Sequence, residues 1–166
     1  MAKDTSKLDN PEVKVANLLK NNGVSISVAE SCTGGLVSHK ITNVPGSSEY
    51  FNRSVVAYSN RAKKELLDVK ADSLQSHGAV SEVVASEMAE GIRVLSGTDL
   101  GLSTTGIAGP GGGTAEKPVG LVYLGLSDPE DTRVKKLSLD GNRWENKRVA
   151  ATEALEYLIA FLEDRY

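Results

Sequence analysis

Apolar residues recur along this chain at two different spacings, which predict alternating helices and strands. Residues 11–23 carry them at helical spacing, whereas residues 24–28 carry them at every second position. The first pattern predicts an amphipathic helix that begins at a proline and ends at a glycine, and the second predicts a strand. Residues 34–42 are expected to form a second helix, which a Pro-Gly pair ends. Residues 1–10 carry no periodic signal, and we expect a flexible tail there.

The same alternation continues through the rest of the chain. A turn rich in Asp and Pro predicts that the last two strands form a hairpin, and a long final helix should pack its apolar stripe on the sheet. This order predicts a single α/β domain over residues 11–166, with three α/β/α layers and a mixed sheet. The expected strands are 54–58, 100–105, 121–126 and 134–139, and the expected helices are 60–67, 73–77, 81–95 and 144–162.

Composition narrows the classes of function. The 166 residues fit one domain that can bury a core without disulfides. With 19 basic and 22 acidic side chains and no basic tract with interleaved aromatics, we expect no nucleic-acid partner. No apolar run approaches the roughly 18 residues of a membrane span, so no membrane partner is expected. The single Cys32 cannot form an internal disulfide and no export signal is visible, so a cytoplasmic location is expected.

The segment 29–35 places a hydroxyl nucleophile, Ser31, where a predicted strand turns into a helix. Backbone N–H groups of a first helical turn lack internal acceptors, so a developing oxyanion would find donors there. If Asn60 caps the next predicted helix, Lys63 lies in its first turn, where the dipole and burial favour a neutral amine that can act as a base. Two plainer interpretations stay open: Ser31 or Thr33 caps the helix, and Lys63 is a solvated surface charge.

Four further residues bear on the chemistry. Tyr58, at the end of the second predicted strand, could hold the lysine, relay a proton or bind substrate, or it could be a core residue. His39 and His77 are both expected to be structural, which argues against a serine triad. Cys32 is either a rival nucleophile or a small buried residue. No His or Cys pair stands at ligand spacing, so no metal site is expected.

A glycine-rich loop over residues 106–120 separates two predicted strands. It lacks the Lys-Ser/Thr ending of a Walker P-loop and does not follow the dinucleotide-binding spacing. Its amides could still bind a phosphate or an oxyanion, with the hydroxyls of Thr104 and Thr105 as further donors. Its length favours a functional loop over a simple turn. Arg143 and Arg148, near the start of the last predicted helix, could contact a phosphate or could be surface residues.

Several ordered blocks resemble one family over nearly the whole chain, the CinA C-terminal domain family, also known as the nicotinamide mononucleotide deamidase family. The blocks are AESCTGG at 29–35, VPGSSEYF at 44–51, VVAYSNRAK at 55–63, HGAVSE at 77–82 and TGIAGPGGGTAEKPVG at 105–120. The chain looks like the stand-alone form, without the molybdopterin-binding-like domain of longer members. The resemblance implies hydrolysis of nicotinamide mononucleotide to nicotinate mononucleotide and ammonia by a homo-oligomer, with no metal or organic cofactor.

The resemblance also implies roles for individual residues. It implies Ser31 as the nucleophile, Lys63 as its general base and Tyr58 as a proton-transfer or positioning residue, with an acyl-enzyme intermediate. Backbone N–H groups near Thr33 to Gly35 would stabilise the tetrahedral intermediate. The expected substrate-binding residues are Thr33, Gly34, Gly35, Thr105, Gly106, Ala108, Gly109, Gly112 and Arg143.

One departure from the family pattern and two rival functions stay open. The family commonly has an acidic residue before the arginine that matches Arg143 and an arginine soon after it, whereas this chain reads GNRWENKR at 141–148. One rival function is a non-catalytic module that binds a pyridine nucleotide and is related to competence or the damage response. The other rival is a serine hydrolase for a different amide. The glycine-rich loop predicts that a phosphate on the substrate matters.

Overall fold

The fold is built on one mixed sheet of five strands. A computed structural model describes residues 10–166. The strands are β1 (Ile26–Glu30), β2 (Phe51–Val56), β3 (Leu100–Gly106), β4 (Leu121–Ser127) and β5 (Thr132–Ser138). They lie in the order β2-β1-β3-β4-β5, with β1 parallel to β2 and β3, and with β4 antiparallel to both β3 and β5. The predicted mixed sheet and its terminal hairpin are confirmed.

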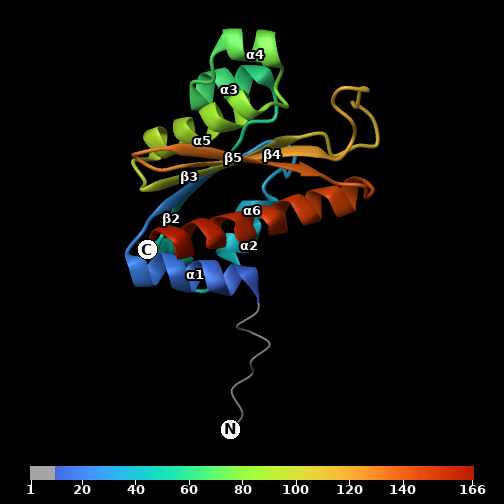
Figure 1. Cartoon of the computed structure of the whole chain (residues 1–166). Coiled ribbons are helices and arrows are strands. Elements are labelled where there is room, and N and C mark those ends of the chain that lie inside the picture. The colour runs from blue at the N-terminus through green and yellow to red at the C-terminus, as the bar shows by residue number, and fades with distance from the viewer. Residues whose placement is uncertain (1–9) are drawn as a thin grey trace.

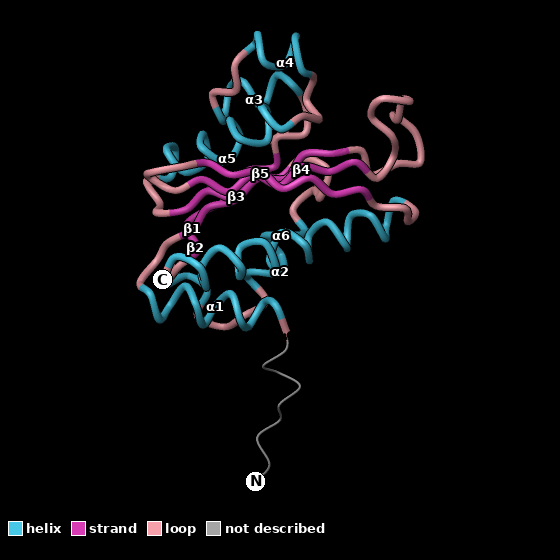
Figure 2. Tube along the Cα trace, in the orientation of Figure 1, coloured by secondary structure: helices cyan, strands magenta, loops and turns pink. Residues whose placement is uncertain are grey.

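Helices cover both faces of this sheet, as Figures 1 and 2 show. The predicted three-layer α/β/α arrangement is therefore confirmed. None of the helices within residues 10–166 combines the length and the apolarity that crossing a membrane requires. One face carries α1 (Pro11–Asn22), α2 (Leu36–Thr42) and α6 (Arg143–Arg165), and the other carries α3 (Asn60–Leu67), α4 (Ala71–His77) and α5 (Glu82–Ser96).

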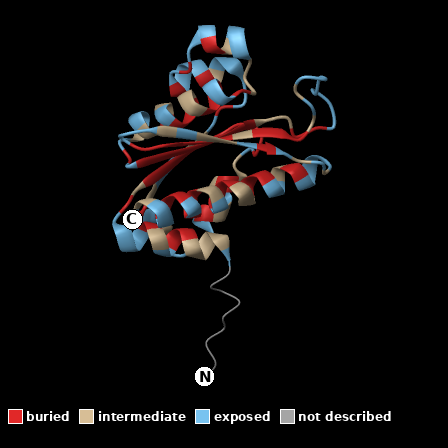
Figure 3. Cartoon of the chain, in the orientation of Figure 1, coloured by how far each residue is buried: buried red, intermediate tan, exposed pale blue. Residues whose placement is uncertain are grey.

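Two apolar cores lie between the layers, and Figure 3 shows the buried residues along the strands and the inner helix faces. The larger core packs α1, α2 and α6 on the sheet, and the smaller one packs α3 and α5 on the opposite face. In the smaller core, a Cβ atom on Gly91 of α5 would lie 1.9 Å from the carbonyl oxygen of Leu67 in α3. The absence of a side chain at Gly91 therefore lets α3, the helix that carries Lys63, pack closely against α5.

The predicted elements differ from the observed ones mainly at their ends. Strand β2 runs over Phe51–Val56 rather than 54–58, because its ladder with β1 begins at Phe51 and ends where Val56 pairs with Glu30. The N-cap of α3 is Ser59 and not Asn60, since the Ser59 side chain accepts a hydrogen bond from the Ala62 N–H at 3.0 Å. The tail expected over residues 1–10 lies outside the described residues, apart from residue 10, which caps α1.

Candidate active site

Three neighbouring strands end at one edge of the sheet, and the candidate residues follow them. Glu30, the last residue of β1, pairs with Val56 of β2 on one side and with Thr104 of β3 on the other. Ser31 comes directly after β1, and Tyr58 lies two residues after the end of β2. In open α/β sheets, ligands bind in the crevice beyond the carboxyl ends of the strands. The topology therefore brings together segments that are far apart in the sequence.

A pocket of about 290 Å³ opens at this edge. Pockets that bind small molecules have volumes of about 300 Å³ or more, so this pocket is a small one. The structure brings the three predicted catalytic residues together here with six of the predicted substrate-binding residues. These nine lining residues are Ser31, Tyr58, Lys63, Thr105, Gly106, Ala108, Gly109, Gly112 and Arg143.

The central contact of the pocket joins Ser31 and Lys63. Lys63 Nζ lies 3.0 Å from Ser31 Oγ and 2.9 Å from the carbonyl oxygen of Ala57, at hydrogen-bond distance from both. The Lys63 side chain is 2% exposed, and no acidic side chain within residues 10–166 forms an ion pair with it. Burial lowers the pKa of Lys63, because desolvation disfavours the ammonium form. The interpretation of Lys63 as a solvated surface charge is therefore wrong.

Helix α3 determines where the lysine points. Ser59 caps this helix, and the Lys63 N–H donates to the Ser59 carbonyl at 3.0 Å, which places Lys63 at the end of the first turn. Leu67 follows Lys63 by four residues, so both lie on the same helix face, and they are the two buried residues of α3. The apolar anchor at Leu67 turns this face inward, and the lysine is buried with it.

Glu30 holds the turn that carries Ser31, and the sequence analysis missed this role. Its side chain is fully buried, and helix α2 begins after Gly35 without a capping bond from its N-cap residue. The Glu30 carboxylate takes the place of the cap, because it accepts hydrogen bonds from the first helical turn. An acidic residue near a helix N-terminus is the available signal in the sequence. The donors are the Thr33 hydroxyl, the Gly35, Val37 and Ser38 N–H groups and the Ser38 hydroxyl, at 2.5–3.1 Å.

These contacts correct one expectation about the turn and bear on a second. Neither Ser31 nor Thr33 caps the helix, because Ser31 faces Lys63 and the Thr33 hydroxyl donates to Glu30. The Gly35 N–H is bound to Glu30 at 3.0 Å and the Gly34 N–H to the Ser31 carbonyl at 3.1 Å. Within the segment from Thr33 to Gly35 that was expected to stabilise an oxyanion, these two amides therefore already have acceptors in the protein. Together with Thr33 they border a separate hollow at the start of α6.

Arg143 links the two sides of the pocket mouth. Its guanidinium donates to the Tyr58 hydroxyl at 3.0 Å and to the Gly109 carbonyl at 2.7 Å. Tyr58 is 60% exposed, so its interpretation as a core residue is wrong. Within residues 10–166, no hydrogen bond joins Tyr58 to Lys63 or Ser31. Tyr58 therefore contacts the polar groups of the site through Arg143.

The glycine-rich loop is anchored by α6 and by its neighbouring strands. The Thr105 hydroxyl donates to the Ala79 carbonyl at 2.7 Å, and the buried Asn146 side chain donates to the Ala108 carbonyl at 3.1 Å. The sequence analysis missed Asn146. The signal was present, because Asn146 lies about one helical turn before Ala150 and about two turns before Ala154, on the apolar face of the final helix.

The remaining candidates from the sequence do not form a second catalytic arrangement. Burial raises the pKa of the Cys32 thiol to about 12, so little of the nucleophilic thiolate forms near neutral pH. His39 and Arg148 border the hollow beside Thr33, and His77 does not line the pocket of Ser31. In the described part of the chain, no group of three His, Cys, Asp or Glu side chains is arranged to hold a metal ion.

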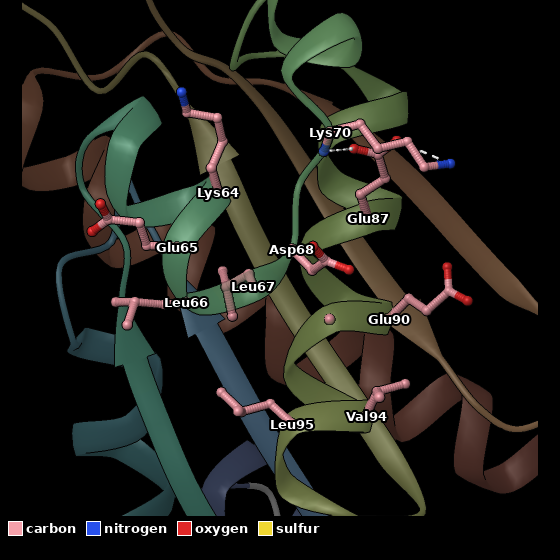
Figure 4. Close-up of a pocket in the computed structure, with 11 residues that line it drawn as sticks. Lys64, Glu65, Leu66, Leu67, Asp68, Lys70, Glu87, Glu90, Val94 and Leu95 are labelled. Atoms are coloured by element: carbon pink, nitrogen blue, oxygen red, sulfur yellow. Dashed lines mark hydrogen bonds and ion pairs between the residues drawn. The ribbon is translucent and has the colours of Figure 1, made fainter.

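A larger groove of about 490 Å³ between α3 and α5 lacks this chemistry. Figure 4 shows its charged rim, where Lys70 and Glu87 contact each other, and its apolar end with Leu66, Val94 and Leu95. The residues that line it include no serine, threonine, cysteine or histidine, so it offers none of these nucleophiles. The candidate active site is therefore the smaller pocket that contains Ser31.

Comparison with known proteins identifies relatives over nearly all of the chain. The family model of the CinA C-terminal domain matches residues 8–162. CinA-like proteins of Kosmotoga olearia and Syntrophomonas wolfei are 57% and 53% identical over 144 and 150 residues, which is 87% and 90% of this chain. Those alignments cover 35% and 36% of the two relatives, so the chain spans little more than a third of their length.

Solved structures of similar proteins have the same fold. A CinA superfamily protein from Klebsiella pneumoniae is 30% identical with a TM-score of 0.90, and the match covers 93% of this chain and 96% of that chain. The competence/damage inducible protein CihA from Agrobacterium tumefaciens is 38% identical with a TM-score of 0.86 over the same shares of the two chains. The likeness in fold thus extends over 93% of this chain.

Proposed function

This chain belongs to the CinA C-terminal domain family, and we propose that it hydrolyses the carboxamide of nicotinamide mononucleotide to give nicotinate mononucleotide and ammonia. The observation that carries the proposal is the 3.0 Å contact between Lys63 Nζ and Ser31 Oγ inside the pocket. A nucleophilic hydroxyl within reach of a buried base is the arrangement that covalent acyl transfer needs. The reaction requires no group beyond the amide, the two side chains and a water molecule.

Lys63 is suited to act as a base because its environment favours the neutral amine. An ammonium ion without a carboxylate partner is costly to bury, so burial lowers the pKa of the Lys63 amine. A neutral amine has two N–H groups and one lone pair. When the Ala57 carbonyl accepts one N–H at 2.9 Å, the lone pair is free to accept the Ser31 hydroxyl proton.

In the first half-reaction, Lys63 takes the proton of Ser31 as Oγ attacks the carboxamide carbon. A bond forms between Ser31 Oγ and that carbon, and the carbonyl electron pair moves onto oxygen to give a tetrahedral oxyanion. The Lys63 ammonium then donates its proton to the amide nitrogen. The C–N bond breaks, ammonia leaves and an ester to Ser31 remains. Lys63 is neutral again at the end of this step.

In the second half-reaction, water replaces ammonia. Lys63 removes a proton from the attacking water, and the hydroxyl adds to the carbon of the ester. The Lys63 ammonium returns the proton to Ser31 Oγ as the C–O bond breaks, which releases the carboxylic acid and restores the enzyme. Tyr58 contributes to positioning in this proposal, because its hydroxyl is held by Arg143 at the pocket mouth. We place the reaction in the cytoplasm, since the single Cys32 forms no disulfide.

The test compares the purified chain with its Ser31→Ala variant on nicotinamide mononucleotide, with ammonia and nicotinate mononucleotide as the measured products. We expect stoichiometric release of both products by the wild type and a loss of about 10³-fold or more in the variant, because the nucleophile is removed. Cys32→Ser serves as the matched control and should retain activity, since the buried thiol has no role in the proposal.

Two results would contradict the deamidase proposal. Equal release by the wild type and Ser31→Ala would remove Ser31 as the nucleophile. Binding of nicotinamide mononucleotide without any release of ammonia would favour the rival interpretation, a non-catalytic module that binds a pyridine nucleotide. Calorimetry on the same preparations measures that binding directly.

A further inference from the structure

The block HGAVSE at residues 77–82 has no role in the reaction described above. In the structure it contains the turn between α4 and α5, and its two central residues, Ala79 and Val80, line the pocket of Ser31. Among the described residues that line this pocket, Val80 and Ile107 are the only branched aliphatic ones, and none is acidic. A ring inside the pocket therefore meets an aliphatic surface and no carboxylate.

Both ends of this turn are fixed to the rest of the molecule. Gly78 ends α4 with φ 74° and ψ 164°, a backbone conformation that is essentially restricted to glycine. The Ser81 hydroxyl caps α5 by accepting the Val84 N–H at 3.3 Å, and it donates to the Gly78 carbonyl at 2.9 Å. The Lys117 ammonium, from the glycine-rich loop, donates to the His77 carbonyl. These contacts restrain the two residues that lie between Gly78 and Ser81.

Thr105 holds the middle of the turn close to Ser31. Its hydroxyl is buried and donates to the Ala79 carbonyl at 2.7 Å. Glu30 of β1 pairs with Thr104 of β3, and the Ser31 N–H extends this ladder by donating to the Thr104 carbonyl at 2.9 Å. Ser31 and Thr105 therefore lie side by side on adjacent parallel segments, whose backbones are about 4.8 Å apart. The bond from Thr105 thus places the turn beside the candidate nucleophile.

The second aliphatic residue, Ile107, reaches the pocket from the same side. Ile107 continues the extended segment of β3, because its N–H donates to the Leu121 carbonyl at 2.9 Å and its carbonyl accepts the Gly120 N–H at 2.7 Å. Side chains two residues apart on an extended segment point to the same face. Ile107 therefore lies on the face of Thr105, which is the face that contacts the turn. Val80 and Ile107 together form the aliphatic wall of the pocket.

The chemistry of the proposed substrate brings its ring to this wall. In a nicotinamide the aromatic ring is bonded directly to the carbon that Ser31 attacks, so the ring stays in the pocket during the reaction. The pocket has a volume of about 290 Å³, and the turn beside Ser31 is restrained at both ends. A substituent on the ring edge that faces the wall would overlap with it, because a restrained wall cannot move aside cheaply.

We propose that Val80 is the specificity-determining residue for the ring of the substrate and that Thr105 is the positioning residue for the turn that carries it. The proposal rests on the deamidase function proposed above and concerns only the acyl part of the substrate. An aliphatic wall selects by shape, and one additional carbon atom in such a pocket changes specificity by about 10- to 200-fold. The unsubstituted ring fits, whereas a ring with a methyl group toward Val80 is excluded.

The experiment measures equilibrium binding to the full chain carrying Ser31→Ala, which prevents turnover. The ligands are nicotinamide mononucleotide and a set of analogues, each with one methyl group on a different free carbon of the ring. We expect at least one analogue to bind about tenfold or more weakly than the parent nucleotide. Adding Val80→Ala, which shortens the side chain, should reduce this difference to less than about threefold. Val80→Ile, which lengthens it, should increase the difference.

Two further variants separate the wall from its surroundings. Val83→Ala is the matched control, because Val83 lies in the first turn of α5 but does not line the pocket, and it should leave the ratio of dissociation constants unchanged. Thr105→Val keeps the shape of the side chain but removes the donor to the Ala79 carbonyl. It should therefore lower the ratio in the same direction as Val80→Ala. An unchanged ratio in Thr105→Val would overturn the positioning role of Thr105.

The outcomes distinguish this role from the deamidase function. Equal affinity of the Ser31→Ala protein for the parent nucleotide and for every methylated analogue would overturn the role of Val80. Equal weakening of all ligands by Val80→Ala would do the same, since a merely structural role predicts that result. If Val80→Ala changes the ratio but the wild type releases no ammonia, the specificity role is retained and the deamidase function is rejected.

Discussion

At the scale of single residues, burial turns Lys63 from an ordinary cation into a candidate base. Because desolvation lowers the pKa of Lys63, the neutral amine forms at a lower pH than in a solvated lysine. We expect kcat/KM to rise with pH through this lowered pKa. The Lys63→Arg side chain stays protonated, so we expect its activity to be about 10²- to 10⁴-fold lower than that of the wild type. The rise of kcat/KM with pH should disappear in this variant. A pH–rate profile measures both, and an unchanged profile in the variant would exclude Lys63 as the base.

Glu30 is a second single residue on which the site depends, because its carboxylate holds the turn that positions Ser31. Glu30→Gln replaces one carboxylate oxygen by an NH₂ group, which cannot accept the two or three hydrogen bonds that end on that oxygen. We expect the free energy of unfolding to fall by about 3 kcal/mol and kcat to fall with it, as urea denaturation and an activity assay will measure. Glu65→Gln, an exposed residue paired with Arg61, should change neither quantity appreciably.

At the scale of elements, the cap of α3 determines how firmly the lysine is held. Ser59→Ala removes the bond to the Ala62 N–H and should cost about 1 kcal/mol of stability, because the first turn loses one of its acceptors. Since Lys63 ends that turn, kcat should fall as well. Asn10→Ala removes the equivalent cap of α1 at a similar cost in stability and should leave kcat unchanged. Equal kcat values in the two variants would contradict a link between this cap and catalysis.

The elements also show how far spacing alone predicts structure. The order of strands and helices followed from apolar periodicity, because burial on one face imposes a period of two or of 3.6 residues. The residues at which the elements begin and end did not follow from this periodicity. The ladder with β1 determines where β2 begins and ends, and the cap of α2 comes from Glu30 in the preceding strand. Contacts between segments decide such ends, and periodicity within a single segment carries no information about them.

At the scale of the whole molecule, the buried lysine links stability to pH. Lys63 has a lowered pKa in the folded state and an ordinary value near 10.5 when unfolded, so the unfolded chain binds more protons between these two values. Stability therefore rises with pH in this window. In Lys63→Met, which cannot titrate, we expect this contribution to vanish, so that the stability difference between wild type and variant changes by up to about 1.4 kcal/mol per pH unit. Urea denaturation from pH 7 to pH 10 measures it, and parallel profiles would contradict it.

The sequence by itself determined the fold class, the family and the segments that carry the site. The spacing of apolar residues can be recognised within each short segment of the sequence. Ordered blocks such as AESCTGG can likewise be recognised along the chain. The candidate pair Ser31 and Lys63 could also be named from the sequence, although the plainer interpretations of both residues stayed open. The sequence shows that a lysine is present, but it does not show whether that lysine is solvated or buried in the folded protein.

Only the tertiary structure decided what these residues contact. Parallel pairing of β1 with β2 and β3 brings Ser31, Lys63 and the glycine-rich loop to one edge of the sheet. It also places the Glu30 carboxylate where it accepts hydrogen bonds from the start of α2. The physical reason is that burial and hydrogen bonding depend on neighbours from distant segments, and these neighbours exist only once the chain has folded.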